Sequence, residues 1–251
     1  MVSRSRRVNP QEITSRTNVV FKAVRSAHVG YGGEVILVEG QKLIEVALGA
    51  GLVPLSIWSD GSWPLPLDCP HYKVSADMYA ALAPTRSGKA PLVVFGAPIL
   101  PTLDVDILTP GRYLLLDRVQ EPGNAGALVR AAVAFGMDGI LWRKPCVYPF
   151  HHATIRASAG CIFLSKNWFM EDLPESINLP IIGAAGEEGA INLDAFQWPP
   201  HFILAMGNEG QGLDASLRAR LSDRVRIPMA AGVESLNVAG AAHIVMYALS
   251  R

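Results

Sequence analysis

Two glycine-rich segments near the C-terminal end of the sequence each follow an apolar run, and they constrain the fold more than any other feature. Residues 202–214 read FILAMGNEGQGLD, and residues 225–249 read VRIPMAAGVESLNVAGAAHIVMYAL. The first segment predicts a buried strand that runs directly into a glycine loop. The second predicts a short strand ending at Pro228, a loop of small residues, and a helix that begins near Ser235. Such loops after buried strands are typical of a nucleotide-type pocket, because glycine lets the backbone approach a ligand closely.

The second half of the chain alternates apolar strands with helices. Strands are expected at 112–116, 139–142, 180–184 and 202–206, and helices at 127–135, at 154–165 and at the C-terminal end. Almost purely apolar strands are typical of a parallel sheet that is covered on both faces. The pattern alone therefore predicts a doubly wound, Rossmann-like domain.

The first hundred residues predict a smaller α/β domain. Helices are expected at 11–29, capped by Thr14 or Ser15, at 41–52 and at 76–82, and strands at 35–38, 55–58, 72–74 and 91–95. The proline-rich stretch APILPTLDVDILTPG then reads as a linker. We therefore expect two domains, residues 1–104 and residues 105–251.

The charge balance limits how this chain binds other molecules. The 22 Lys and Arg residues equal the 22 Asp and Glu residues in number, so affinity for a nucleic acid must come from local patches. One candidate is the N-terminal stretch, which is either an RNA contact or a solvated tail and which contains Arg4, Arg6, Arg7, Arg16, Lys22 and Arg25. No apolar run approaches the roughly 20 residues that span a bilayer, and no signal peptide is apparent. A cytoplasmic protein without a membrane partner is expected.

Neither the cysteines nor the histidines form a metal-binding pattern. Cys69, Cys146 and Cys161 are widely spaced, which is typical of reduced thiols in a cytoplasmic protein. His151 and His152 are adjacent, so their side chains diverge on a helix or a strand, and no partner stands at ligand spacing. We expect no metal.

Three segments, taken in order, resemble the SpoU/TrmH family of RNA ribose methyltransferases within the SPOUT class. The first is LLLDRVQEPGNAGALVRAAVAFGMDGILW at 114–142, where Arg130 follows Asn124 by six residues. The second is GNEGQGL, and the third combines RIPM with ESLNVA. The resemblance covers roughly residues 112–251, and the preceding region is more loosely similar to the small α/β substrate-binding domain of that family.

The resemblance implies a fold and an activity. The C-terminal domain would be a Rossmann-like parallel sheet with a deep trefoil knot, paired as a homodimer through helices near the cofactor cleft. The enzyme would use S-adenosylmethionine to methylate a ribose 2′-hydroxyl, of ribosomal RNA more than of transfer RNA because a domain precedes the catalytic one. The alternatives left open are a non-catalytic RNA-binding protein of the same fold and a nicotinamide-dependent α/β oxidoreductase.

The resemblance also assigns roles to individual residues. The implied catalytic set is Asn124, Arg130, Glu209, Ser235 and Asn237, and the implied cofactor-binding set is Ala205, Met206, Gly207, Ile227, Met229 and Leu236. A tight turn leading into a helix would aim Asn124 and Arg130 into one cleft, and Glu209 would accept from Asn237 or Arg130. Because a guanidinium group does not lose its proton in proteins, we interpret Arg130 as a phosphate clamp that orients the hydroxyl, and not as a base.

Overall fold

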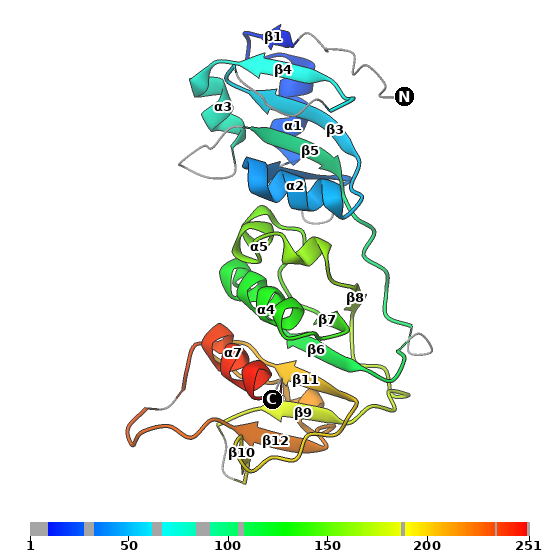
Figure 1. Ribbon diagram of the computed structural model, residues 1–251, viewed down its shortest axis with the longest axis vertical. Coiled ribbons are helices and arrows are strands. Elements are labelled where there is room, and N and C mark those ends of the chain that lie inside the picture. The colour runs from blue at the N-terminus through cyan, green and yellow to red at the C-terminus, as the bar shows by residue number, and fades with distance from the viewer. Residues whose placement is uncertain are drawn as a thin grey trace, which may run out of the picture. The chain divides into compact units, whose positions relative to one another are not determined.

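The computed structural model describes residues 10–27, 33–61, 67–83, 91–104, 108–186, 189–233 and 235–249. The chain divides into two compact units (Figure 1). One comprises Met1–Pro98 with Phe150–Ala153, and the other comprises Ile99–Pro149 with Thr154–Arg251. The expected boundary between 104 and 105 adjoins residues 105–107, which lie outside the described residues, as do Arg4, Arg6 and Arg7.

The N-terminal unit contains a mixed sheet with the strand order β1-β4-β3-β5-β2. Its elements are β1 (Gln11–Ile13), α1 (Val19–Ala27), β2 (Val35–Glu39), α2 (Gln41–Gly49), β3 (Pro54–Ser59), β4 (His71–Val74), α3 (Ala76–Leu82) and β5 (Leu92–Gly96). Strand β4 runs parallel to β1 and β3, whereas β5 runs antiparallel to β2 and β3. Phe21, Trp58 and Leu82 are fully buried in its core.

The helix expected across residues 11–29 is wrong at its beginning. Residues 11–13 form strand β1, which pairs with β4 about sixty positions later and buries Ile13. Helix α1 begins only at Val19, and the cap is Asn18, whose Oδ1 accepts from the backbone nitrogens of Val20 and Phe21 at 2.9 and 3.3 Å. A pairing partner so distant in the sequence leaves no local signal.

The C-terminal unit contains a seven-stranded sheet in which every pairing is parallel, with the order β10-β12-β9-β11-β6-β7-β8. The strands are β6 (Arg112–Asp117), β7 (Gly139–Arg143), β8 (Asn167–Met170), β9 (Ile181–Ala184), β10 (Ile191–Asn192), β11 (Phe202–Met206) and β12 (Asp223–Arg226). The helices are α4 (Pro122–Ala134), α5 (His152–Ala157), the 3₁₀ helix η2 (Cys161–Phe163), α6 (Ala215–Arg218) and α7 (Val238–Leu249). The predicted α/β fold with a parallel sheet is confirmed.

The strand order reverses between β6 and β11, in the middle of this sheet. From β6 the chain continues through α4 to β7 on one side, while β11, β9 and β12 follow on the other side. Leu116 pairs with Met206, so the loops that leave β6 and β11 begin side by side. Ligands of open α/β sheets bind at such a reversal, outside the carboxyl ends of the strands.

Two helices, α4 and α7, lie side by side against the sheet (Figure 1). Helix α4 begins at Pro122 and not near residue 127, because proline suits the first helical position and Glu121 caps the helix by accepting from the Asn124 nitrogen at 2.6 Å. Helix α7 begins at Val238, so Ser235 lies ahead of it. Asn237 is its cap, with Oδ1 accepting from the Ala239 nitrogen at 2.9 Å.

Candidate functional site

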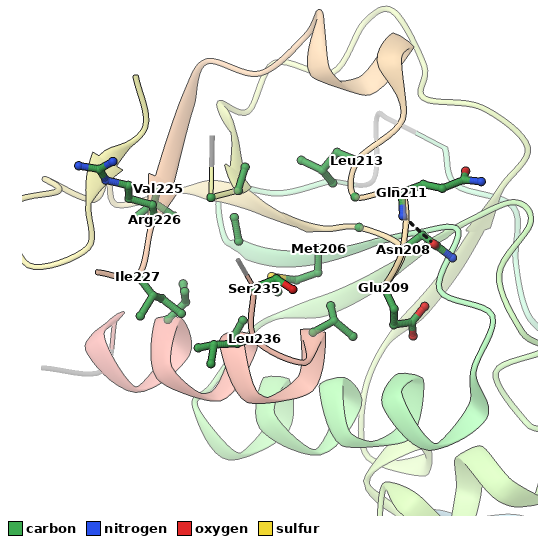
Figure 2. Close-up of a pocket in the computed structure, with 18 of the residues that line it drawn as sticks. Met206, Asn208, Glu209, Gln211, Leu213, Val225, Arg226, Ile227, Ser235 and Leu236 are labelled. Atoms are coloured by element: carbon green, nitrogen blue, oxygen red, sulfur yellow. Dashed lines mark hydrogen bonds between the residues drawn. The ribbon is translucent and has the colours of Figure 1, made fainter. Parts of the chain in front are cut away.

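A cavity of about 450 Å³ opens at the carboxyl edge of the C-terminal sheet. Residues 184–186 after β9, 206–213 after β11 and 225–229 at the end of β12 form its walls, together with side chains from residues 235–245 (Figure 2). The volume falls within the range of about 300–1,000 Å³ that is typical of small-molecule sites. Four separate segments of the chain thus build one pocket beside the strand-order reversal.

Most of the residues expected to hold a cofactor line this cavity. They are Met206, Gly207, Ile227, Met229 and Leu236. Ala205 is the exception, since it is fully buried within β11 and is not part of the lining. Met229 and Leu236 leave 37% and 41% of their surface exposed, so large apolar side chains face solvent inside the pocket. Such side chains suit an apolar ring, and these assignments stay predictions.

Gly207 allows the loop after β11 to fold back on itself. A Cβ atom at this position would lie 2.4 Å from the carbonyl carbon of Gly212 and 2.5 Å from the Leu213 nitrogen. The backbones of Asn208 and Gly212 join through two hydrogen bonds, of 3.0 and 2.9 Å. Because the contacts at Gly207 are with backbone, no side-chain rotation relieves them. The loop therefore requires glycine there.

Asn208 fixes the same loop and was not among the residues expected at the site. Its Oδ1 accepts from the backbone nitrogens of Gly210 and Gln211 at 3.0 and 3.1 Å, and its Nδ2 donates to the Arg118 carbonyl at 3.1 Å. Asparagine commonly closes turns in this way. The position after the first loop glycine was the available signal, since a short amide side chain there can bond the backbone amides two and three residues ahead.

Three of the predicted catalytic residues join in one chain of hydrogen bonds. Asn237 Nδ2 donates to Asn124 Oδ1 at 3.1 Å, and Asn124 Nδ2 donates to Glu209 Oε1 at 2.7 Å. The partner of Glu209 is therefore Asn124, and not Asn237 or Arg130 as the sequence suggested. Glu209 and Ser235 also line the cavity. The two amides are thus held in one orientation at its edge.

Arg130 takes no part in these hydrogen bonds. It is six residues after Asn124 within α4, which places the two residues about 120° apart around the helix axis. Arg130 is exposed and is not part of the cavity lining. Asn124 is also absent from the lining, and the expectation that both side chains point into one cleft stays a prediction. Within the described part of the chain, Arg130 has no hydrogen-bond or ion-pair partner.

A buried ion pair between Asp117 and Arg143 supports the end of the loop 207–213. Asp117, which is fully buried at the end of β6, accepts from Arg143 Nη1 at 2.7 Å and from the Asp214 nitrogen at 2.6 Å. Burial lowers the pKa of the Arg143 guanidinium, but hydrogen bonds to Asp172 and Asp117 outweigh it and raise the pKa above its usual value. Hydrogen bonds from Ser216 lower the pKa of Asp214. The far end of the loop is thus fixed to the central strand.

Three features together define a cofactor-binding α/β enzyme. They are the parallel sheet, the cavity beside its strand-order reversal, and the hydrogen-bonded side chains of Asn237, Asn124 and Glu209 at the cavity edge. Residues 111–247 match the model of the SpoU rRNA Methylase family. Over 95% of its length the chain is 31% identical to an uncharacterized tRNA/rRNA methyltransferase of Synechocystis, covering 93% of that protein. It is 30% identical to the 23S rRNA (guanosine(2553)-2'-O)-methyltransferase RlmP of Bacillus subtilis, over 85% of this chain and 87% of RlmP. This chain belongs to the SpoU rRNA methylase family.

A solved structure agrees on the fold. The AdoMet-bound rRNA methyltransferase from Sinorhizobium meliloti aligns with a TM-score of 0.82 at 24% identity, over 95% of this chain and 96% of that one. Family membership confirms an RNA methyltransferase that uses S-adenosylmethionine, and the nicotinamide alternative is dropped. In the ranges that the structure describes, no group of side chains suits a metal ion, and no helix has the length and apolarity to cross a bilayer.

Proposed function

We propose that this enzyme transfers a methyl group from S-adenosylmethionine to a ribose 2′-hydroxyl of ribosomal RNA, with transfer RNA as the alternative acceptor. The observation that carries the proposal is the chain Asn237–Asn124–Glu209 at the edge of a glycine-walled cavity. The name of the Bacillus subtilis relative supports ribose 2′-O transfer on 23S rRNA. The cytoplasm, where bacterial ribosomal RNA is found, is the proposed place of action.

The lining of the cavity fits the proposed cofactor. Ile227, Met229 and Leu236 offer apolar contact for an adenine ring, and the backbone around Gly207 is open to a ribose. Glu209 brings a carboxylate to the same cavity, complementary to a positively charged sulfonium group. S-adenosylmethionine supplies an already activated methyl group, so the protein has to contribute position, a proton route and exclusion of water.

The hydrogen-bonded side chains of Asn237, Asn124 and Glu209 would orient the ribose that accepts the methyl group. The Asn124 side chain has both its oxygen and its nitrogen engaged, so its amide cannot rotate freely. Ser235 adds a hydroxyl to the cavity wall. We assign the hydroxyl proton to solvent or to a substrate phosphate. Of the five proposed catalytic residues only Glu209 is suited to accept a proton, and Glu209 already accepts a hydrogen bond from Asn124.

Arg130 would bind the RNA and not the cofactor. A guanidinium group forms bidentate hydrogen bonds with phosphate, and Arg130 is exposed and outside the cavity. We expect Arg130→Ala to reduce methyl transfer by at least about a hundredfold while its affinity for S-adenosylmethionine stays within about twofold. Lys166→Ala, at another exposed cation, is the control.

The test combines calorimetry with a transfer assay. Wild-type protein is titrated with S-adenosylmethionine, its demethylated product and NAD, and methyl incorporation is then measured on ribosomal and transfer RNA. Binding of the two methionine-derived ligands with incorporation at a ribose supports the proposal. Binding of NAD alone, or incorporation at a base, contradicts it. A large loss of cofactor affinity in Arg130→Ala would contradict the proposal that Arg130 binds the RNA and not the cofactor.

A homodimer is part of the proposal. Ile244 and Tyr247, one turn apart on α7, leave 41% and 47% of their surface exposed, and Tyr247 contacts Phe135 at the end of α4. This apolar surface supports pairing through α7 and α4. Sedimentation equilibrium should give twice the chain mass of 27.0 kDa, and a single chain mass at micromolar concentration would contradict pairing.

We also propose the deep trefoil knot that the family resemblance implies. After β12 the chain returns to α7, and the cavity that the loop 207–213 lines is also lined by Ile227, Met229, Ser235 and Leu236. That arrangement supports a chain end that passes behind the loop. An experimental map traced continuously from β11 to α7 would test it, and an unthreaded path would contradict it.

A further inference from the structure

We infer, on the basis of the proposed function, that Arg118 is a positioning residue that holds the cofactor loop in its binding conformation. Arg118 is not part of the cavity lining, but it contacts two residues of the loop 207–213 and the residue that follows the loop. Its carbonyl accepts from Asn208 Nδ2 at 3.1 Å, and its Nη1 donates to Gln211 Oε1 at 3.2 Å and lies 3.4 Å from Asp214 Oδ2. Asn208 and Gln211 both line the cavity.

The backbone of Arg118 adopts an uncommon conformation to make these contacts. Its φ is 59°, in the left-handed region that residues other than glycine rarely adopt. The turn lets the carbonyl and the side chain of one residue face the same loop. Strained backbone of this kind persists only where the surroundings enforce it, and it often occurs beside functional sites. Here it lies where β6 leaves the sheet, next to the loop from β11.

One nitrogen of the Arg118 side chain is in an unfavourable environment. Arg118 Nε is buried without a hydrogen-bond partner in the described structure, and Asp117 Oδ2 lies 3.8 Å away. A buried donor without a partner is unfavourable, so the contacts of Nη1 must compensate for it. Because the loop 207–213 is rich in glycine, few side chains pack it into one shape. The internal hydrogen bonds of Asn208 shape the turn, contacts with neighbouring elements hold it in place, and Arg118 supplies several of those contacts.

Asp117, an acidic neighbour of Arg118, has a different role. Asp117 is fully buried and accepts from Arg143 and from the Asp214 nitrogen, so its loss would remove a buried partner of the Arg143 cation, leave the Asp214 nitrogen without its acceptor and destabilise the unit. The side chain of Arg118 is 21% exposed and ends on the loop. A change there alters the support of the loop without leaving a buried charge. Arg118 is therefore the residue at which support of the cofactor can be separated from stability.

The experiment uses Arg118→Met, which removes the donors and keeps an unbranched side chain. We expect both the Kd and the KM for S-adenosylmethionine to rise about tenfold, while kcat at saturating cofactor stays within about twofold. A residue that only stabilised the fold would lower the Tm without this separation of KM from kcat. The control is Arg112→Met, at the opposite end of β6, where the guanidinium donates to the Gly136 carbonyl at 3.2 Å.

A double variant tests whether Arg118 acts through Gln211. If it does, Arg118→Met combined with Gln211→Ala binds the cofactor no more weakly than the weaker single variant. Losses that add fully, or an Arg118→Met protein with wild-type Kd, overturn the inference. If Arg118→Met does not fold, Arg118→Asn decides, because asparagine tolerates the left-handed conformation but is too short to reach Gln211. Wild-type protein that binds no S-adenosylmethionine would instead refute the proposed function.

Discussion

Replacing Gly207 with alanine places one methyl group against the backbone of the loop that lines the cavity. The added Cβ would lie 2.4 Å from the Gly212 carbonyl carbon and 2.5 Å from its oxygen, whereas ordinary contact begins near 3.4 Å. The φ of Gly207 is not in the left-handed region, so alanine is acceptable to the local backbone. The effect is therefore steric, and the two segments must separate by about 1 Å to accept the methyl group.

The structure gives the magnitude of this change. Separation weakens the two hydrogen bonds between the Asn208 and Gly212 backbones, of 3.0 and 2.9 Å, and each contributes about 1 kcal/mol. A loop at the surface relaxes outward in the free protein, and the cofactor must then restore the closed form. We expect a loss of about 2–3 kcal/mol in binding free energy, which is a rise of about 30- to 150-fold in the Kd for S-adenosylmethionine.

Isothermal titration of Gly207→Ala with S-adenosylmethionine and its demethylated product is the assay. Gly96→Ala is the matched control, because Gly96 also ends a buried strand but an added Cβ there meets nothing within 4 Å. We expect the control to bind as the wild type does. If Gly207→Ala also binds with wild-type affinity, the close approach of the two backbones does not shape the cofactor site, and the reasoning is refuted.

Two further predictions concern titratable groups in the same unit. Burial raises the pKa of the Cys146 thiol to about 12, so at pH 8 iodoacetamide should label the partly exposed Cys161 and leave Cys146 unmodified in peptide mass maps; equal labelling of native protein would contradict this. A hydrogen bond from Arg143 lowers the pKa of Asp172 in the folded protein. The ion pair therefore contributes to stability above the ordinary aspartate pKa of about 3.9, and this contribution is lost as the pH falls through the lower pKa of the folded state. Urea unfolding should therefore show a difference between wild type and Asp172→Asn at pH 6 that shrinks below about pH 4, and a difference independent of pH would exclude the ion pair as its cause.

The cofactor cavity and the polar chain depend on different kinds of information. The glycines after β11 and the apolar side chains of residues 227–236 are local features, and the sequence predicts where they stand. The contact between Asn124 and Glu209 joins residues 85 positions apart, and that between Arg118 and Gln211 joins residues 93 positions apart. Such pairs exist only because β6 and β11 are neighbours in the sheet. No local pattern specifies that adjacency.

The errors in the predicted elements have the same origin. The helix expected at 154–165 ends at Ala157, because Ala159 and Gly160 adopt left-handed φ values of 51° and 82°, and only a short 3₁₀ turn follows. The short edge strands β8 and β10 are absent from the prediction, since their residues lack a long apolar run and pair with the margins of the sheet. Propensity is a weak guide where a few tertiary contacts decide the conformation.

By itself the sequence determined the parallel α/β class, the glycine loops that a cofactor needs and the motifs that identify the family. These follow from side-chain periodicity and from backbone freedom, which act over a few residues. Only the tertiary structure decided that Asn124 bonds Glu209, that Arg130 is not part of the cavity lining and that Arg118 contacts the loop. The physical reason is that strand order and helix start positions set these contacts, and both depend on packing between segments far apart in the chain.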